Sequence, residues 1–231
     1  FSSAATDLTG PATGNAWDNV FVWDRDSPPD FSIRLVSHAP SSVTSRGDNS
    51  SQAPVISGDG AHVAYRSLAT DLVTGAGGPQ HWNAFLWDRL APTASANHLL
   101  SRSAGVELMR GNGDSYVAAV SHDGRLVGFS SFSTDLVPGL VGACVHNAYL
   151  WDRQAAAPAA SRLISHTPTA ANVRAYAGIV RGGNAEPVYS GARLLAAEPT
   201  RLFEDAQTTA QWRKKEFYPV LNERREEGNN N

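Results

Sequence analysis

The chain has 231 residues, of which 42% are hydrophobic and 18% charged, and its formal net charge is −3. These values are typical of a globular domain, and the scattered arginines form no basic stripe of the kind that nucleic-acid-binding proteins carry. No apolar run approaches the roughly 18 residues of a membrane-spanning helix, and the single cysteine excludes an internal disulfide.

One seven-residue segment recurs three times at a spacing of 64 residues. It reads Asn-Val-Phe-Val-Trp-Asp-Arg at 19–25, Asn-Ala-Phe-Leu-Trp-Asp-Arg at 83–89 and Asn-Ala-Tyr-Leu-Trp-Asp-Arg at 147–153. Three further signatures keep this spacing: Thr-Asp-Leu from 6, 70 and 134, Leu-Val-Ser-His and its variants from 35, 99 and 163, and Ser-x-Asp-Gly from 57 and 121. Segments that recur at a fixed interval indicate a repeat architecture.

Each full repeat divides into four short strands. In the second repeat we predict strands at 54–57, 62–66, 83–87 and 98–101, with Asp59-Gly60 as a hairpin turn. In the third repeat the corresponding strands are 118–121, 126–130, 147–151 and 162–165. The third strand of each repeat is apolar at consecutive positions, which is typical of a strand buried on both faces. Four-stranded units of this kind are the blades of a β-propeller.

A family resemblance accompanies this pattern. The order S-x-D-G, V-A-[YF]-x-S, T-D-L-V and N-[AV]-[FY]-[LV]-W-D-R resembles the WD40-like (PD40) β-propeller repeats of bacterial TolB-type proteins, over roughly residues 1–170. The resemblance implies a propeller that binds other proteins in the periplasm or outside the cell, or the non-catalytic partner domain of a peptidase. The eukaryotic WD40 repeat fits less well, because its period is shorter.

The predicted fold is therefore all-β: a partial β-propeller over 1–172, with a part-blade at 1–38 and blades at 54–102 and 118–166. Beyond about residue 172 the register fails, since Ala-Glu-Pro-Val stands at 185–188 where Ser-x-Asp-Gly is due. We interpret 173–200 as a decayed blade or partial strands. Residues 201–231 form a charged, divergent tail in which 206–217 has the pattern of a polar helix. A fused tail, a shifted reading frame and a terminal cap are all open interpretations of it.

The N-terminus has the sequence of a repeat's middle. Since Phe1-Ser2-Ser3 matches that part of the later repeats, we expect a cut end rather than a natural start. Closed propellers have at least four blades. We therefore expect this chain to belong to a larger protein, or to close by self-association through its open blades.

The topology of a blade predicts where a binding surface lies. The long connections, at about 73–82 and 39–53, share one face, and the short turns share the other. Long loops on a rigid scaffold commonly carry recognition. The connections between second and third strands supply the candidate binding residues Trp17, Asp18, His81, Trp82 and His146, with Cys144 nearby. Such groups suit a protein or a sugar, and the alternative is that the tryptophans pack against strand edges.

Several charged residues recur in every repeat, and we interpret them as scaffold because an active site is seldom present three times in one chain. Carboxylates that end the third strand can accept backbone N–H bonds in the next turn: Asp24, Asp88 and Asp152. The arginines that follow are expected to pair with a neighbouring carboxylate or carbonyl: Arg25, Arg89 and Arg153. A third set is expected to cap the loop after the second strand: Asp7, Asp71 and Asp135.

The chain contains no G-x-S-x-G, H-E-x-x-H, Walker or G-x-G-x-x-G motif, and its long connections hold no carboxylate cluster for calcium. We therefore predict a non-enzymatic scaffold that binds a protein partner on its long-loop face, without a catalytic residue, metal or cofactor. A carbohydrate-binding propeller and an accessory propeller of a larger hydrolase or peptidase are the alternatives.

Overall fold

The computed structural model describes residues 1–9, 17–28, 32–106, 108–140, 146–155, 160–167 and 170–174. Regular structure in these ranges is β-strand, apart from the short 3-10 helix η2 at Thr93–Ser95. No helix within them is long and apolar enough to cross a membrane. The strands are β1 (Ser2–Ser3), β2 (Asn19–Trp23), β3 (Ile33–Leu35), β4 (Ser51–Ile56), β5 (His62–Ser67), β6 (Asn83–Asp88), β7 (Asn97–Leu99), β8 (Ser115–Val120), β9 (Leu126–Ser131), β10 (Asn147–Asp152), β11 (Ser161–Leu163), β12 (His166–Thr167) and β13 (Ala170–Arg174).

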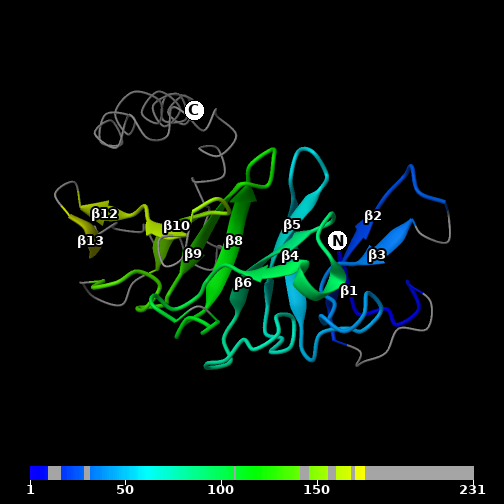
Figure 1. Ribbon diagram of the computed structural model, residues 1–231, viewed down its shortest axis with the longest axis horizontal. Coiled ribbons are helices and arrows are strands. Elements are labelled where there is room, and N and C mark those ends of the chain that lie inside the picture. The colour runs from blue at the N-terminus through cyan, green and yellow to red at the C-terminus, as the bar shows by residue number, and fades with distance from the viewer. Residues whose placement is uncertain are drawn as a thin grey trace, which may run out of the picture. The chain divides into compact units, whose positions relative to one another are not determined.

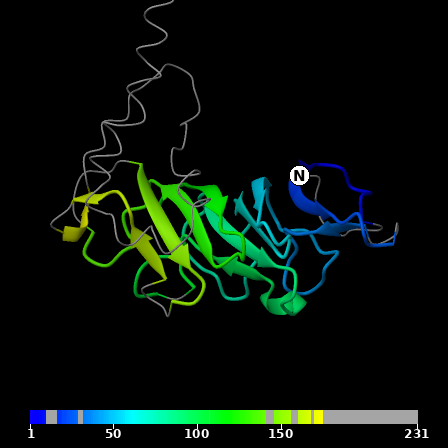
Figure 2. The ribbon, with the colours of Figure 1, turned by 90° about the horizontal axis from the view of Figure 1, so that it is seen from above.

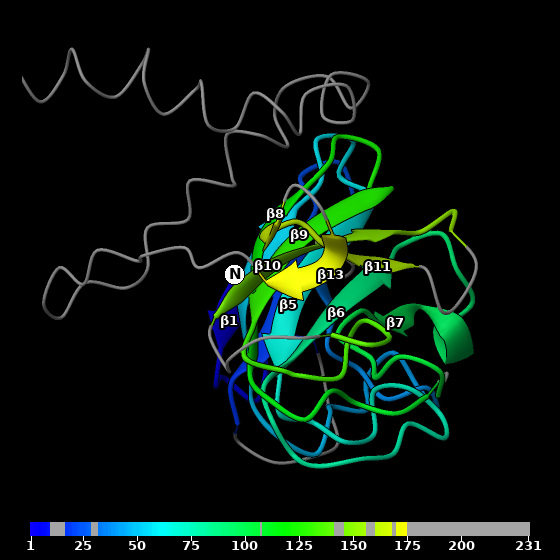
Figure 3. The same ribbon diagram turned by 90° about the vertical axis from the view of Figure 1, so that its left-hand side faces the viewer.

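Three antiparallel sheets follow one another in chain order and lie side by side (Figures 1 and 2). The first sheet is β1-β2-β3, the second β4-β5-β6-β7 and the third β8-β9-β10-β11, so each strand pairs with the next in sequence. Strands β12 and β13 form a separate pair, seen nearest the viewer in Figure 3. The prediction of an all-β chain with four-stranded antiparallel sheets is confirmed. Beyond β13, the predicted partial strands and the helical tail lie outside the described residues.

The first strands of both full sheets begin earlier than predicted, at Ser51 rather than 54 and at Ser115 rather than 118. A β-bulge accounts for the difference in β4, where the register shifts between Gln52 and Val55 and Ala53 has a φ of 52°. Pro54, where the predicted strand began, has no N–H. It lies inside an edge strand instead, where a missing ladder donor is tolerated.

The second sheet is buried on both faces, as the apolar third strand predicts. Successive side chains of a strand point to opposite faces. Tyr65, Phe85 and Trp87 pack toward the first sheet, and Ala64 and Leu86 toward the third. Each large apolar side chain buried in this way stabilises the fold by about 1.5–3 kcal/mol. The two junctions between sheets therefore hold the core.

In each sheet an Asn–Ser pair joins the start of the strand that carries the repeated segment, β2, β6 or β10, to the chain just beyond the next strand. Ser37 Oγ donates to Asn19 Oδ1 at 3.1 Å and accepts from the backbone N–H of Val20 at 3.0 Å. The pair recurs as Ser101 with Asn83 and as Ser165 with Asn147. Buried polar atoms need partners, which explains why both residues recur at 64-residue intervals.

Candidate binding site

The long connections of the chain meet on one side of the sheets. The loop after β5 and the link after β7 are joined by hydrogen bonds between Gly77 N–H and the Leu108 carbonyl at 2.8 Å, and between Arg110 N–H and the Gly77 carbonyl at 2.9 Å. The Asp-Gly turns lie at the opposite ends of the strands, where Arg89 N–H donates to the Ala61 carbonyl at 2.9 Å. The molecule thus has a long-loop side and a short-turn side.

The repeated Asp and Arg after the third strand join neighbouring sheets on the short-turn side. Arg89 donates to Asp24 of the preceding repeat, and this contact holds the pKa of the Asp24 carboxyl at about 2, below its ordinary 3.8. Arg153 donates likewise to Asp88, at 3.2 Å, and contacts the buried His62. Each of these two arginines therefore pairs with an aspartate of the preceding repeat.

The same aspartates shape the turns that follow them. The Oδ1 atoms of Asp24, Asp88 and Asp152 accept a backbone N–H two residues on, at 3.1, 2.8 and 3.0 Å. At the ends of the repeat the ion pairs differ. Within the described part of the chain Arg25 pairs with its neighbour Asp26, and Asp152 pairs with Arg125 of its own sheet, which lowers the pKa of Asp152.

Two aspartates of the Thr-Asp-Leu signature reach beyond the loop that they were expected to cap. Asp71 and Asp135 accept from the backbone N–H groups of Asp48 and Asn112, which lie in the links between sheets. They therefore join two connections, because the long-loop side brings those connections together. Burial raises the pKa of Asp71. The first member of the set, Asp7, is exposed.

A chain of side-chain contacts crosses the long-loop side of the second sheet and includes two of the predicted binding residues. Gln52 Nε2 donates to Asp18 Oδ2 at 2.6 Å, and Arg66 donates to Gln52 Oε1 at 3.2 Å. The Arg66 guanidinium lies over the rings of Trp82, at 4.7 Å from the centroid, and Tyr116, at 5.1 Å. All five residues are half-buried. We call Asp18, Gln52, Arg66, Trp82 and Tyr116 the Arg66 cluster.

The cluster continues into the third sheet and the next loop. The His146 ring stacks on Phe132 at 4.3 Å and meets Tyr116 edge-on at 5.7 Å. Burial lowers the pKa of His146, which favours the neutral imidazole. Phe132 stays about half exposed. This arrangement extends the aromatic surface beyond the guanidinium.

Asp114 connects the loop before β6 with the link that leads into β8. Its Oδ1 accepts the backbone N–H of Trp82 at 3.0 Å and lies 3.4 Å from His81 Nδ1. The predicted residues Asp18, His81, Trp82 and His146 therefore all take part in the cluster or its borders. Trp17 is about half exposed, and Cys144 lies outside the described residues.

The Arg66 cluster consists of positions at which the repeats differ. Arg66 corresponds to Ser130, Gln52 to Tyr116, and Trp82 to Asp18 and His146. The sequence did not point to Gln52, Arg66, Asp114, Tyr116 and Phe132, because none of these residues recurs in every repeat. A search for strand positions that break the repeat would have found Arg66 and its neighbours.

The cluster offers binding chemistry of a specific kind. A guanidinium held between two aromatic rings keeps its geometry, and aromatic residues with arginine are enriched in protein interfaces. Within the ranges that the structure describes, no group of three His, Cys, Asp or Glu residues could hold a metal ion. The arrangement can present flat aromatic surface and hydrogen-bond donors to a ligand.

Comparison with known proteins adds one similarity. A model of the fatty acid cis/trans isomerase family matches residues 197–231. The match begins after the last described strand, β13, and includes no residue of the three sheets. No curated protein matches the chain.

Proposed function

We propose that the three sheets are blades of a TolB-type β-propeller, and that the protein is a non-enzymatic scaffold that binds a protein partner through its long-loop side. The observation that carries the proposal is a division between two kinds of residue. Residues that recur every 64 positions hold sheets and turns together, whereas residues that differ between repeats gather in the Arg66 cluster. Scaffold residues are expected to recur, and a recognition surface is expected to vary.

The composition of the cluster favours a protein as the ligand. Binding energy at protein interfaces is concentrated in Trp, Tyr and Arg side chains that are held rigidly and half-buried. Arg66, Trp82 and Tyr116 are such residues, and their mutual contacts limit the entropy lost on binding.

The test compares proteins retained by the immobilised wild-type chain with those retained by Arg66→Ala and Trp82→Ala. Leu90→Ala, on the short-turn side, is the matched control, and circular dichroism checks that each variant is folded. We expect one set of proteins to bind wild type and Leu90→Ala and to be lost from both cluster variants. Retention of the same proteins by all four chains would contradict the proposal. Binding on a glycan array that Trp82→Ala abolishes would assign the cluster to carbohydrate instead.

A second candidate is an accessory domain of a larger enzyme, and the similarity of residues 197–231 to fatty acid cis/trans isomerases is the observation that favours it. The coding region on both sides of this sequence decides the question. A reading frame that continues into an isomerase domain would support an accessory role. Interruption of the frame between the repeats and residue 197 would contradict it.

A further inference from the structure

The outer face of the first sheet carries a tryptophan that the other two repeats bury. Trp23, Trp87 and Trp151 occupy the same position in their repeats. The side chains of Trp87 and Trp151 are 5% and 6% exposed, because a preceding sheet covers them, whereas Trp23 is 58% exposed. Trp87 also donates its indole N–H to His38 of the preceding repeat, at 3.3 Å. Trp23 therefore lies on a face that a neighbouring sheet covers in the other two repeats.

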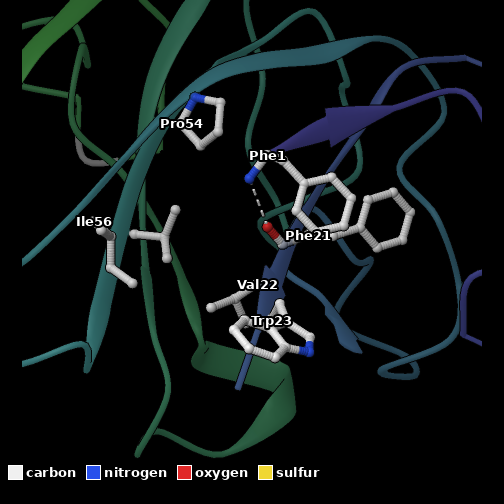
Figure 4. A pocket seen from close by; sticks show the side chains of 7 residues that line it. Phe1, Phe21, Val22, Trp23, Pro54 and Ile56 are labelled. Carbon is white, nitrogen blue, oxygen red and sulfur yellow. Dashed lines mark hydrogen bonds between the residues drawn. The ribbon is translucent and has the colours of Figure 1, made fainter. Parts of the chain in front are cut away.

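A hollow of about 170 Å³ adjoins this tryptophan (Figure 4). Phe1, Phe21 and Trp23 line it from the first sheet, and Pro54 and Ile56 line it from β4 of the second sheet, so the hollow lies beside the β1 edge where the two sheets meet and borders the outer face at Trp23. Phe1, Trp23 and Ile56 are each about half exposed. Monomeric proteins seldom expose neighbouring large apolar side chains, and such patches mark interfaces.

The opposite end of the row of sheets shows the complementary pattern. Ile164 follows β11 at the position that Val36 and Leu100 occupy in the first two repeats. Val36 and Leu100 are fully buried by the next sheet, but Ile164 is 49% exposed. Ala148 of β10 is exposed too, whereas its counterpart Ala84 is buried. At each junction within the chain, the corresponding face of the preceding sheet covers the tryptophan of the next sheet.

Charges at the two ends are complementary in the same way. At the two internal junctions an arginine pairs with the aspartate of the preceding repeat, as Arg89 does with Asp24. Arg25 has the position of Arg89, and its side chain is 80% exposed. Asp152 has the position of Asp24 in the last repeat. One end of the row therefore presents the arginine of a junction, and the other end presents the aspartate, which in the single chain pairs with Arg125 of its own sheet.

We propose that the outer face of the first sheet docks onto the outer face of the third sheet in a second copy of this chain. Trp23 then packs on Ile164 of the partner subunit, and Arg25 reaches Asp152 of the partner subunit. A second copy is the fitting occupant because the contact brings together the same tryptophan, arginine and aspartate, with an aliphatic side chain opposite the tryptophan, as in a junction that the chain already forms twice. A head-to-tail contact covers both faces of every copy once the assembly closes, and two copies would make a pair of such junctions.

Light scattering during size-exclusion chromatography, over a range of protein concentrations, tests the proposal. We expect the wild-type chain to have twice its mass of 24.6 kDa. Trp23→Lys and Ile164→Lys each place a charge on one face, so each alone is expected to have the mass of one chain. Their mixture retains one intact junction and is expected to form a heterodimer. Leu90→Lys, on the short-turn side, is the matched control and is expected to stay dimeric.

Circular dichroism verifies that each variant is folded, and Arg25→Glu provides a second disruption that leaves the apolar core unchanged. We expect this variant to dissociate at concentrations at which the wild type is dimeric. A monomeric wild type, or unchanged masses for Trp23→Lys and Arg25→Glu, would overturn the proposal. A mass greater than that of two chains would exclude a closed dimer. The Arg66→Ala variant is expected to remain dimeric, so this result is independent of the proposed partner site.

Discussion

Tyr65 donates its hydroxyl to Asn97 Oδ1 at 2.7 Å, inside the second sheet. The Asn97 amide in turn donates to the carbonyls of Val36 and His38, at 3.2 and 3.1 Å. One buried side chain thereby connects two strands of the second sheet with the chain that leaves the first. At the junction between the second and third sheets, Ser161 Oγ donates to the corresponding carbonyl, that of Leu100, at 3.2 Å.

Replacement of this asparagine is expected to destabilise the fold strongly. Asn97→Ala leaves the hydroxyl of Tyr65 and two backbone carbonyls without their donor or acceptor, and each such buried group costs about 1–3 kcal/mol. Urea unfolding measures the loss. Ser161→Ala removes a single bond and should cost about 1 kcal/mol. An Asn97→Ala loss no greater than that of Ser161→Ala would show that Asn97 does not connect the sheets.

The two Asp-Gly turns provide a matched pair of glycines. Gly60 has a φ of +70° and Gly124 a φ of +66°, so alanine at either position is strained by about 1–2 kcal/mol. A Cβ at Gly60 would meet open space, but one at Gly124 would collide with the buried ring of His62. Gly124→Ala should therefore cost about 1–3 kcal/mol more than Gly60→Ala. Equal losses in thermal unfolding would rule out this contact.

Acid should weaken the junction between the first two sheets. The pKa of Asp24 is about 2 in the fold, below 3.8, chiefly because Arg89 donates to it. A carboxyl with a depressed pKa stabilises the folded state above its unfolded pKa, and this contribution is lost as the pH falls from 3.8 toward about 2.

NMR titration of the Asp24 carboxyl carbon in wild type and Arg89→Gln checks this linkage. We expect a midpoint of about 2 in the wild type and one nearer 3.8 in the variant. The acid-induced loss of stability should be smaller in Arg89→Gln. Identical midpoints would exclude Arg89 as the cause.

Arg66 and Trp82 should be energetically coupled. A half-buried guanidinium over an indole ring contributes about 0.5–1 kcal/mol. A double-mutant cycle with Arg66→Ala and Trp82→Leu, measured by urea unfolding, should recover a coupling of that size. The same cycle with Trp23→Leu in place of Trp82→Leu should be additive. Additivity in both cycles would show that the contact between the guanidinium and the indole ring does not contribute to the free energy of unfolding.

Local signatures in the sequence were reliable where their partners lie nearby in the chain. The Ser-x-Asp-Gly turns form as predicted, with Ser57 Oγ donating to Asp59 Oδ1 at 2.5 Å and Ser121 Oγ to Asp123 Oδ1 at 2.6 Å. For Asp71 the sequence predicted a cap on its own loop but did not reveal that Asp48, in a different connection, also donates its backbone N–H to this carboxylate. Residue type alone does not reveal which connections meet.

The sequence by itself determined the number, order and burial of the strands in the full repeats. Hydrophobic pattern and turn chemistry are local, and a constant 64-residue spacing gives each repeat the same pairing. Only the tertiary structure decided that Arg66, Trp82 and Tyr116 meet, and that Trp23 is exposed while Trp87 is buried. These outcomes depend on which sheet stacks against which, and identical segments acquire different surroundings according to whether a neighbouring sheet covers them.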